Sequence, residues 1–133
     1  MPALAITDRG GVYGAVKFLQ ACRKLGVKSI IGTALEVDGE EVVIIARNLH
    51  GYSNLCRLLS FAHADQPKGE ARANIAKVAE HRGDLFYLSA TDDSKRLSEL
   101  QEALGKESVF SELHHHLGPA DQWVLEGRAA MAR

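Results

Sequence analysis

Residues 7–11, Thr-Asp-Arg-Gly-Gly, place a carboxylate and a guanidinium directly after a short apolar run, and Glu36 stands near the end of the next apolar run. An apolar run that stops at polar residues and a pair of glycines is typical of a strand that ends at a site. Carboxylates in such a position can bind a divalent metal, and an arginine can bind a phosphate group. Arg9 has no lone pair to offer a metal, but its charge could neutralise nearby carboxylates and so fill the electrostatic role of a cation.

Each of these residues also has an ordinary structural explanation. Asp8 can cap the helix that follows it, and Arg9 can pair with a neighbouring acid. Glu36 can be an exposed glutamate at a strand end, whereas a buried carboxylate there would need a metal or a cation such as Arg9. We predict that Arg9 lies close to Glu36 or to Asp8, and that Asp8 and Arg9 line the site.

Three consecutive histidines at residues 114–116 are the other candidate for metal binding. Side chains alternate between the two faces of a strand, so at most His114 and His116 can share a face. A compact zinc site would need further ligands from elsewhere in the chain. We take Glu36 and His116 as the candidate metal ligands. No catalytic residue is proposed, because no phosphate-binding glycine signature is present and no Ser-His-acid arrangement stands out.

Strand-like and helix-like segments alternate along the chain. The strand-like runs are residues 4–7, 29–37, 41–46, 85–88 and 109–113, and the helix-like runs are residues 12–25, 52–63 and 73–81, with a further helix after a cap at residues 91–93. The Asp-Gly pair at residues 38–39 predicts a hairpin turn, and Gly26 is expected to end the first helix. This alternation predicts an α/β fold with much parallel sheet, whose functional loops lie at the carboxyl ends of the strands. The strand ends at residues 8–9, Glu36 and residues 112–116 should therefore converge.

The composition is that of one ordinary soluble domain. The 133 residues are 46% hydrophobic and 25% charged, and a formal net charge of −1 provides no general attraction for nucleic acid. Basic residues Lys17, Arg23, Lys24 and Lys28 cluster around one predicted helix. This cluster is explained first as a solvated face and only secondarily as a patch for nucleic acid.

The sequence indicates a cytoplasmic protein without a membrane segment. Cys22 and Cys56 lie in helix-like runs and are better explained as two thiols than as a disulfide, which favours a reducing compartment. No apolar run approaches the ~18 residues that span a bilayer, and the first residues do not resemble a signal peptide. Residues 1–133 begin directly in a strand-like run and end in a helix-like run, so we expect one domain truncated at both ends.

Several stretches, in this order, resemble the PHP (polymerase and histidinol phosphatase) domain at the N-terminus of bacterial DNA polymerase III alpha subunits. The matching stretches are residues 3–8, 14–16, 30–32 with Glu36, 45–48, 51–60 and 110–116. The block at residues 51–60, Gly-Tyr-Ser-Asn-Leu-Cys-Arg-Leu-Leu-Ser, is the most specific of them. The resemblance covers nearly the whole chain. It implies a PHP-like (β/α)7 barrel, incomplete in this chain, whose active members hold metal ions and hydrolyse phosphoesters.

The chain departs from the family pattern at several metal positions. The opening His-x-His motif and the closing Asp-x-His motif would both lie outside residues 1–133. Arg9 replaces the histidine expected after Thr-Asp, and Glu41 stands where a histidine often begins a strand. Only Glu36 and His116 match ligand positions, and affinity depends on ligand number and geometry. The resemblance therefore implies no tightly bound cofactor, with Zn²⁺ or Mn²⁺ as the metal if the site is functional.

The Thr-Asp-Arg variant and residues 67–70 are more similar to the error-prone branch of these polymerases. This resemblance implies a PHP domain fragment in DNA replication or repair, with a degenerate metal site and no activity of its own, while nucleotide transfer belongs to other domains. It would support the polymerase and contact its other domains and replication proteins, and DNA would bind through the parent protein. The alternatives are a metal-dependent phosphoesterase or 3′–5′ proofreading nuclease, and a protein-interaction module alone. Exposed sheet edges could also pair and give an oligomer.

Overall fold

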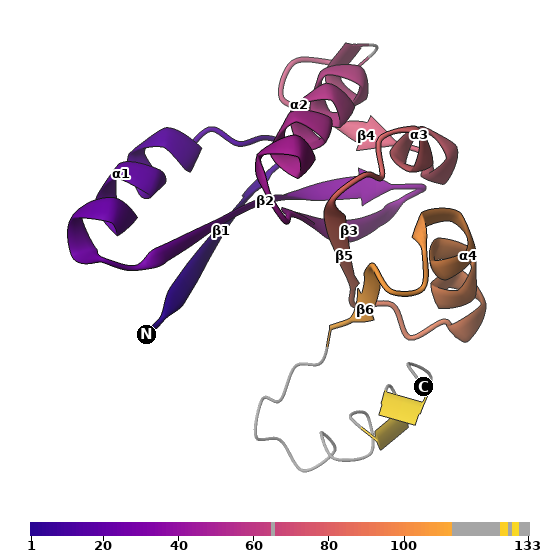
Figure 1. The fold of residues 1–133 in the computed structure, drawn as a ribbon. Helices are drawn as coiled ribbons and strands as arrows, with labels where there is room; N and C mark the ends of the chain where they lie inside the picture. Colours follow the sequence, from indigo (N-terminus) through magenta and orange to yellow (C-terminus); the bar gives the residue numbers. More distant parts are fainter. Residues whose placement is uncertain (65, 113–125, 128, 131–133) are drawn as a thin grey trace.

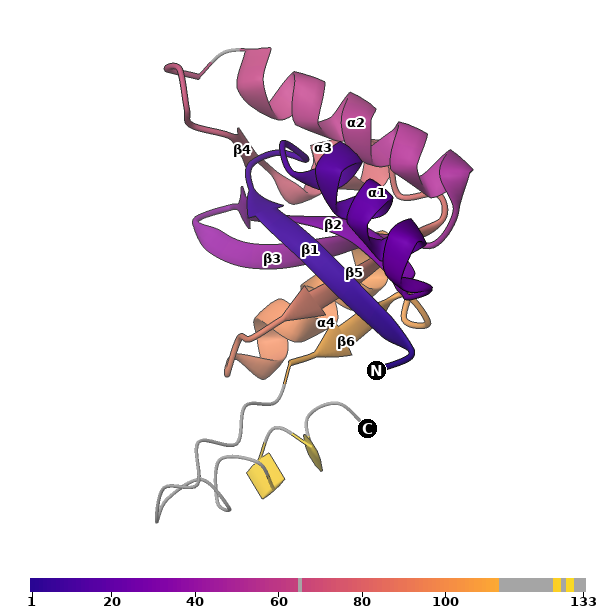
Figure 2. The ribbon, with the colours of Figure 1, turned by 90° about the vertical axis from the view of Figure 1, so that its left-hand side faces the viewer.

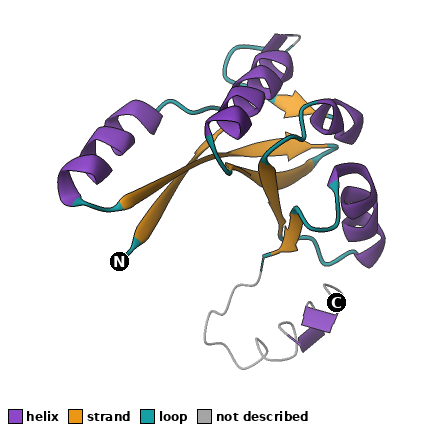
Figure 3. Ribbon diagram, viewed as in Figure 1, coloured by secondary structure: helices purple, strands orange, loops and turns teal. Residues whose placement is uncertain are grey.

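The computed structural model describes residues 1–64, 66–112, 126–127 and 129–130. Strands and helices alternate along residues 3–111 (Figures 1 and 3). The strands are β1 (Ala3–Arg9), β2 (Lys28–Val37), β3 (Glu40–Ala46), β4 (Arg72–Ala73), β5 (Leu85–Ser89) and β6 (Val109–Ser111). The helices are α1 (Ala15–Leu25), α2 (Leu49–Ala64), α3 (Ile75–Glu80) and α4 (Ser94–Leu104). This alternation confirms the predicted α/β class.

The strands form one mixed sheet in the order β1-β2-β3-β5-β6, and the short β4 pairs with the end of β2. The pairs β1–β2 and β5–β6 are parallel, whereas β3 is antiparallel to both β2 and β5. Strands β1, β2, β5 and β6 therefore point in the same direction and end at one edge of the sheet, where β3 begins. Within the described residues β1 and β6 are not paired with each other, so the barrel that the resemblance implied is not closed.

The helices pack against the sheet and give the domain its core (Figures 1 and 2). α1 packs on β1 and β2, α2 packs on β3, β4 and β5, and α4 packs on α3 and β6. Sheet residues such as Leu35, Ile44 and Leu85 are fully buried, and they join Leu58 of α2 and Leu100 of α4 in one apolar cluster. Among the described residues, no helix combines the length and the apolar character needed to cross a bilayer.

Three local signals form as the sequence predicts. The hairpin between β2 and β3 turns at Asp38 and Gly39, which have φ values of 50° and 87°, and positive φ is what a two-residue hairpin turn favours. Gly26 ends α1 in the left-handed conformation. The Asp93 side chain accepts a hydrogen bond from the backbone N–H of Lys95 at 2.9 Å and caps α4. Local residue choice therefore decides where these elements begin and end.

Most element boundaries differ from the prediction by one to three residues, and two of these differences matter for the sites. Residues 72–73 form strand β4 rather than the start of a helix, because the next residue is a cap. The side chain of that cap, Asn74, accepts a hydrogen bond from the backbone N–H of Lys77 at 2.8 Å. Helix α1 begins at Ala15 and not at residue 12, since residues 10–14 form the turn that leaves β1. Both differences bear on the sites described below.

Replacing Tyr87 with phenylalanine is expected to raise the free energy of unfolding by about 1 kcal/mol, because a buried hydroxyl without a partner costs desolvation energy. Tyr87 is fully buried, and its hydroxyl has no hydrogen-bond partner among the described residues. Burial raises the pKa of this tyrosine far above its ordinary value. Urea denaturation followed by circular dichroism measures the change. The control Tyr13→Phe, at a position that is 75% exposed, should leave stability unaltered; a destabilised Tyr87→Phe variant would contradict the prediction.

Candidate functional site

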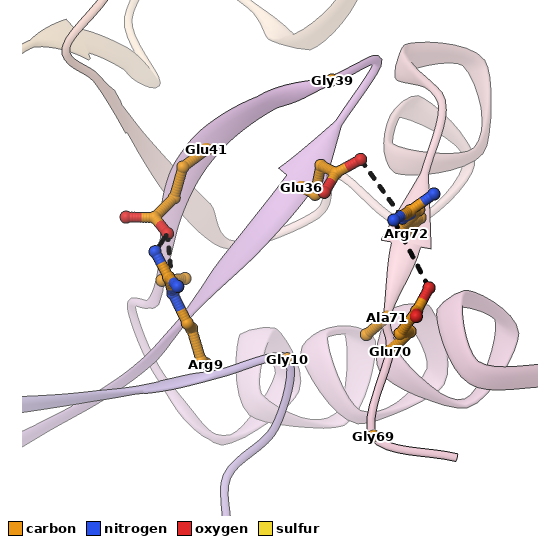
Figure 4. A pocket seen from close by; sticks show the side chains of 10 residues that line it. Arg9, Gly10, Glu36, Gly39, Glu41, Gly69, Glu70, Ala71 and Arg72 are labelled. Carbon is orange, nitrogen blue, oxygen red and sulfur yellow. Dashed lines mark hydrogen bonds and ion pairs between the residues drawn. The ribbon is translucent and has the colours of Figure 1, made fainter. Parts of the chain in front are cut away.

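A charged cavity of about 350 Å³ lies at the edge of the sheet where β1 and β2 end and β3 begins (Figure 4). Its walls come from the end of β1, from the β2–β3 hairpin and from the segment that leads into β4. The lining residues are Arg9, Gly10, Ala34, Glu36, Gly39, Glu41, Gly69, Glu70, Ala71 and Arg72. Three glutamates and two arginines thus line one cavity at the carboxyl ends of the strands, where the predicted α/β fold places functional loops.

Two glutamates face each other across neighbouring strands in this cavity. Glu36 of β2 is directly opposite Glu41 of β3 in the antiparallel register. Like charges in directly opposite positions destabilise a strand pair unless other charges compensate them. Arg9 provides one such charge: its Nη2 and Nε donate to Oε2 of Glu41 at 2.7 and 3.1 Å. Arg72 provides the other, with its Nε 3.3 Å from Oε1 of Glu36.

The sheet topology explains why the two arginines reach different glutamates. Arg9 is the last residue of β1 and pairs in register with Ala34, two residues before Glu36 on the same strand face. The chain leaves the sheet after Arg9, and β4 takes up the same edge of β2 farther along, where Arg72 pairs in register with Glu36. Nη2 of Arg72 also lies 3.4 Å from Oε2 of Glu70. The two central glutamates are thus adjacent, each is paired with one arginine, and Glu70 lies beyond Arg72.

These ion pairs are open to solvent. The Arg9 side chain is 85% exposed and the Glu41 side chain 51% exposed. Surface pairs of this kind contribute at most about 1 kcal/mol to stability, so the pairs matter more for the charge balance of the cavity than for the fold. Arg9 and Arg72 each contact one oxygen of a central glutamate, Oε2 of Glu41 and Oε1 of Glu36. Within the described residues, no group of three or more His, Cys, Asp or Glu side chains is placed to hold a metal ion.

The structure corrects the expected partner of Arg9. We predicted that Arg9 would lie against Glu36 or Asp8, whereas its ion pair is with Glu41. The physical reason is the strand register, which places Glu41 within reach of Arg9 and leaves Glu36 to Arg72. The Glu36 side chain is 44% exposed and belongs to an exposed strand end, which was the ordinary explanation for it.

Asp8 is not among the residues that line the charged cavity. Its Oδ2 accepts a hydrogen bond from the backbone N–H of Gly14 at 2.6 Å, at the residue that caps α1. Thr33 on β2 holds the same turn, because its hydroxyl donates to the carbonyl oxygen of Asp8 at 2.9 Å and accepts from the N–H of Gly11 at 3.1 Å. Asp8 therefore fixes the turn that precedes α1 rather than capping the first turn of the helix itself, which was its ordinary explanation.

The second candidate metal ligand, His116, lies outside the described residues, as does the rest of the histidine run. The pairing of Glu36 with His116 stays a prediction. Sequence reasoning missed Glu70 and Arg72, which complete the cavity. A signal was available: residues two apart in an extended segment point to the same face, so Glu70 and Arg72 could have been recognised as a charged pair.

The PHP domain family matches residues 1–129 of the chain. The error-prone DNA polymerase of Pseudomonas fluorescens is 34% identical over 135 residues, which cover 98% of this chain and 13% of that protein. The error-prone DNA polymerases of Xanthomonas axonopodis and Mycolicibacterium paratuberculosis are 34% and 30% identical over 84% and 98% of the chain, and 11% and 14% of those proteins. The chain thus spans a small part of the length of these relatives. The match over residues 1–129 and these relatives together show that the chain belongs to the PHP domain family.

Proposed function

We propose that this chain is the PHP domain of an error-prone DNA polymerase III alpha-type subunit, and that it supports the polymerase without hydrolysing phosphoesters itself. The observation that carries the proposal is the ion pair between Arg9 and Glu41. Both residues stand where the resemblance leads one to expect histidines, and the strands bring them together with a bond of 2.7 Å. At two positions where the resemblance implies histidines, the chain thus has a pair of opposite charges.

The charge balance supports this proposal. The guanidinium groups of Arg9 and Arg72 together carry the same positive charge as one divalent cation. They hold Glu36, Glu41 and Glu70 in place by hydrogen bonds and ion pairs, as a metal would hold them by coordination. An arginine cannot be deprotonated to make room for a metal. A metal ion at these carboxylates would have to compete with both guanidinium groups.

The wider role follows from the kind of relative that the chain resembles. The matched error-prone DNA polymerases are far longer than this chain, which covers 13% of the first of them. We place nucleotide transfer in other parts of such a protein, and we assign residues 1–133 to a single PHP-like domain that contacts those parts and replication proteins in the cytoplasm. DNA would be bound by the whole polymerase rather than by the charged cavity, whose three glutamates outnumber its two arginines.

Metal content and hydrolysis test the proposal directly. The purified chain, incubated with Zn²⁺ or Mn²⁺ and desalted, is expected to retain well below one metal ion per chain by mass spectrometry of the metal. It should release neither phosphate from p-nitrophenyl phosphate nor nucleotides from an oligonucleotide, beyond the rate of a Glu36→Ala control. Stoichiometric metal together with hydrolysis that Glu36→Ala abolishes would instead establish the alternative, a metal-dependent phosphoesterase or proofreading nuclease.

A gain of metal binding provides a second test of the same idea. The double variant Arg9→His with Glu41→His removes the ion pair and adds two imidazole ligands beside Glu36, so we expect it to retain more Zn²⁺ than the native chain. The matched control is Arg9→Gln with Glu41→Gln, which removes the same charges and adds no imidazole. Equal metal retention by the two double variants would show that these positions do not form a common site.

A further inference from the structure

A second cavity, of about 280 Å³, lies between the turn that leaves β1 and helix α2. Its lining is Gly10, Gly11, Val12, Tyr13, Cys56, Leu59, Ser60 and His63, and we call it the α1–α2 groove. The groove is built on a fixed turn, because the Nε2 atom of His63 lies 2.6 Å from the carbonyl oxygen of Gly10 and Thr33 holds the N–H of Gly11. A cavity with such fixed walls can receive a side chain without reorganising the turn.

Apolar side chains are exposed around the groove. Tyr13, one of its lining residues, is 75% exposed, and Val16 in the first turn of α1 is 65% exposed. A single exposed apolar residue needs no explanation, but exposed apolar residues beside an open apolar cavity are typical of a surface that binds a partner. Figure 2 shows α1 and α2 on the same side of the sheet, with α1 next to β1.

The two helices of this region carry basic side chains and no acidic ones. Residues 10–35, which include all of α1, contain no aspartate or glutamate, and neither do residues 42–64, which include all of α2. The basic residues of the first stretch are Lys17, Arg23, Lys24 and Lys28. None of the four forms an ion pair within the part of the chain that the structure describes, whereas Arg9, Arg72, Lys77 and Arg96 all do.

We propose that the α1–α2 groove docks an acidic segment of a partner protein, which inserts one leucine- or phenylalanine-sized side chain between Tyr13 and Leu59. Lys17 lies about one helical turn after Tyr13 and Lys24 lies two turns farther along, so both follow the exposed face of α1 away from the groove. A partner whose apolar anchor is flanked by carboxylates would match both the apolar groove and the lysines along α1. This inference adds a partner to the proposed supporting role. It rests on the proposed function only because a supporting role requires a partner.

A protein segment fits this surface better than a nucleic acid does. Single-stranded nucleic acid is bound by basic grooves with several aromatic side chains on which successive bases stack. The groove has two aromatic rings, those of Tyr13 and of His63, whose ring is bonded to the Gly10 carbonyl, and the rest of the lining is apolar, small or weakly polar. An apolar pocket beside a helix that carries unpaired lysines instead suits a partner segment with one buried anchor side chain and charged flanking residues, which is the usual anatomy of a protein interface.

A selection of peptides tests the proposal without knowledge of the natural partner. A random peptide display library is selected on the immobilised full chain and depleted on a Ser60→Trp variant, in which an indole at an exposed helix position fills the groove. The recovered peptides are expected to carry net negative charge and one large apolar residue at a constant place. The proposal would be overturned if the recovered peptides had no net negative charge. It would also be overturned if the same peptides were recovered with and without depletion on the Ser60→Trp variant. Circular dichroism establishes that the Ser60→Trp variant is folded.

Charge reversals then locate the site for one recovered peptide, labelled with fluorescein and followed by anisotropy. Lys17→Glu with Lys24→Glu should weaken binding at least about tenfold, since complementary charges are replaced by repulsive ones. The control, Lys95→Glu with Lys106→Glu, makes the same change of net charge on another part of the surface and should alter the Kd by less than about twofold. Equal loss in both variants, or tighter binding of a single-stranded oligonucleotide than of any peptide, would overturn the proposal. Metal content and hydrolysis of the native chain are measured separately, so failure here leaves the proposed function standing.

Discussion

Substituting alanine for Gly51 should lower the free energy of unfolding by about 2–3 kcal/mol, although alanine is the better helix former. Gly51 is buried in the first turns of α2, and a Cβ atom at this position would overlap the carbonyl oxygen of Asp84. Neither the Asp84 carbonyl nor the backbone of Gly51 can move freely. The Asp84 carbonyl accepts the N–H of Arg47 at 3.0 Å, and the N–H of Gly51 donates to the side-chain oxygen of Asn48 at 2.9 Å.

Chemical denaturation monitored by circular dichroism measures the free energy of unfolding. The sign of its change on Gly51→Ala distinguishes steric overlap from helix propensity. If helix propensity alone governed the position, Gly51→Ala would stabilise the protein by up to about 1 kcal/mol. The control Ser53→Ala, at an exposed position of the same helix, should change stability by less than about 0.5 kcal/mol. A stabilised Gly51→Ala variant would show that α2 can shift away from the start of β5. Because α2 forms one wall of the α1–α2 groove, the variant should also weaken peptide binding there.

Replacing Arg96 with leucine is expected to cost about 2 kcal/mol of stability, since its hydrogen bonds are made by a charged group that is largely removed from water. The Arg96 side chain is only 12% exposed. Its Nη2 donates to the carbonyl oxygen of Val37 at 3.0 Å and lies 3.4 Å from Oδ2 of Asp38, and its Nε lies 3.7 Å from Oε2 of Glu40. These contacts tie α4 to the β2–β3 hairpin, which borders the charged cavity.

The same denaturation assay tests this prediction. The matched control is Lys95→Leu, because Lys95 is the exposed neighbour on α4 and its loss should change stability by less than about 0.5 kcal/mol. Arg96→Lys should recover only part of the loss, since an ammonium group cannot reproduce the planar set of donors that contacts several acceptors. Arg96→Leu with native stability would mean that solvent replaces the arginine at the hairpin without cost.

Much of the fold could be predicted because its signals are local. The turn at Asp38-Gly39, the C-terminal glycine of α1 and the cap at Asp93 depend on the conformations of a few consecutive residues, and all three form as predicted. Strand β4 was missed because a two-residue strand has no periodicity to detect. Its existence depends on the open edge of β2 beyond Arg9, which no local pattern reveals.

The features of the candidate site likewise fall into those that the sequence determined and those that depend on the tertiary structure. The sequence by itself determined that Arg9 cannot be a metal ligand and that acids and bases gather at the carboxyl ends of strands, since side-chain chemistry and strand order suffice for both statements. Only the tertiary structure decided that Arg9 pairs with Glu41 and Arg72 with Glu36. Partner choice depends on the register of strands that are far apart in the chain, and a shift of one residue would send these side chains to the other face of the sheet.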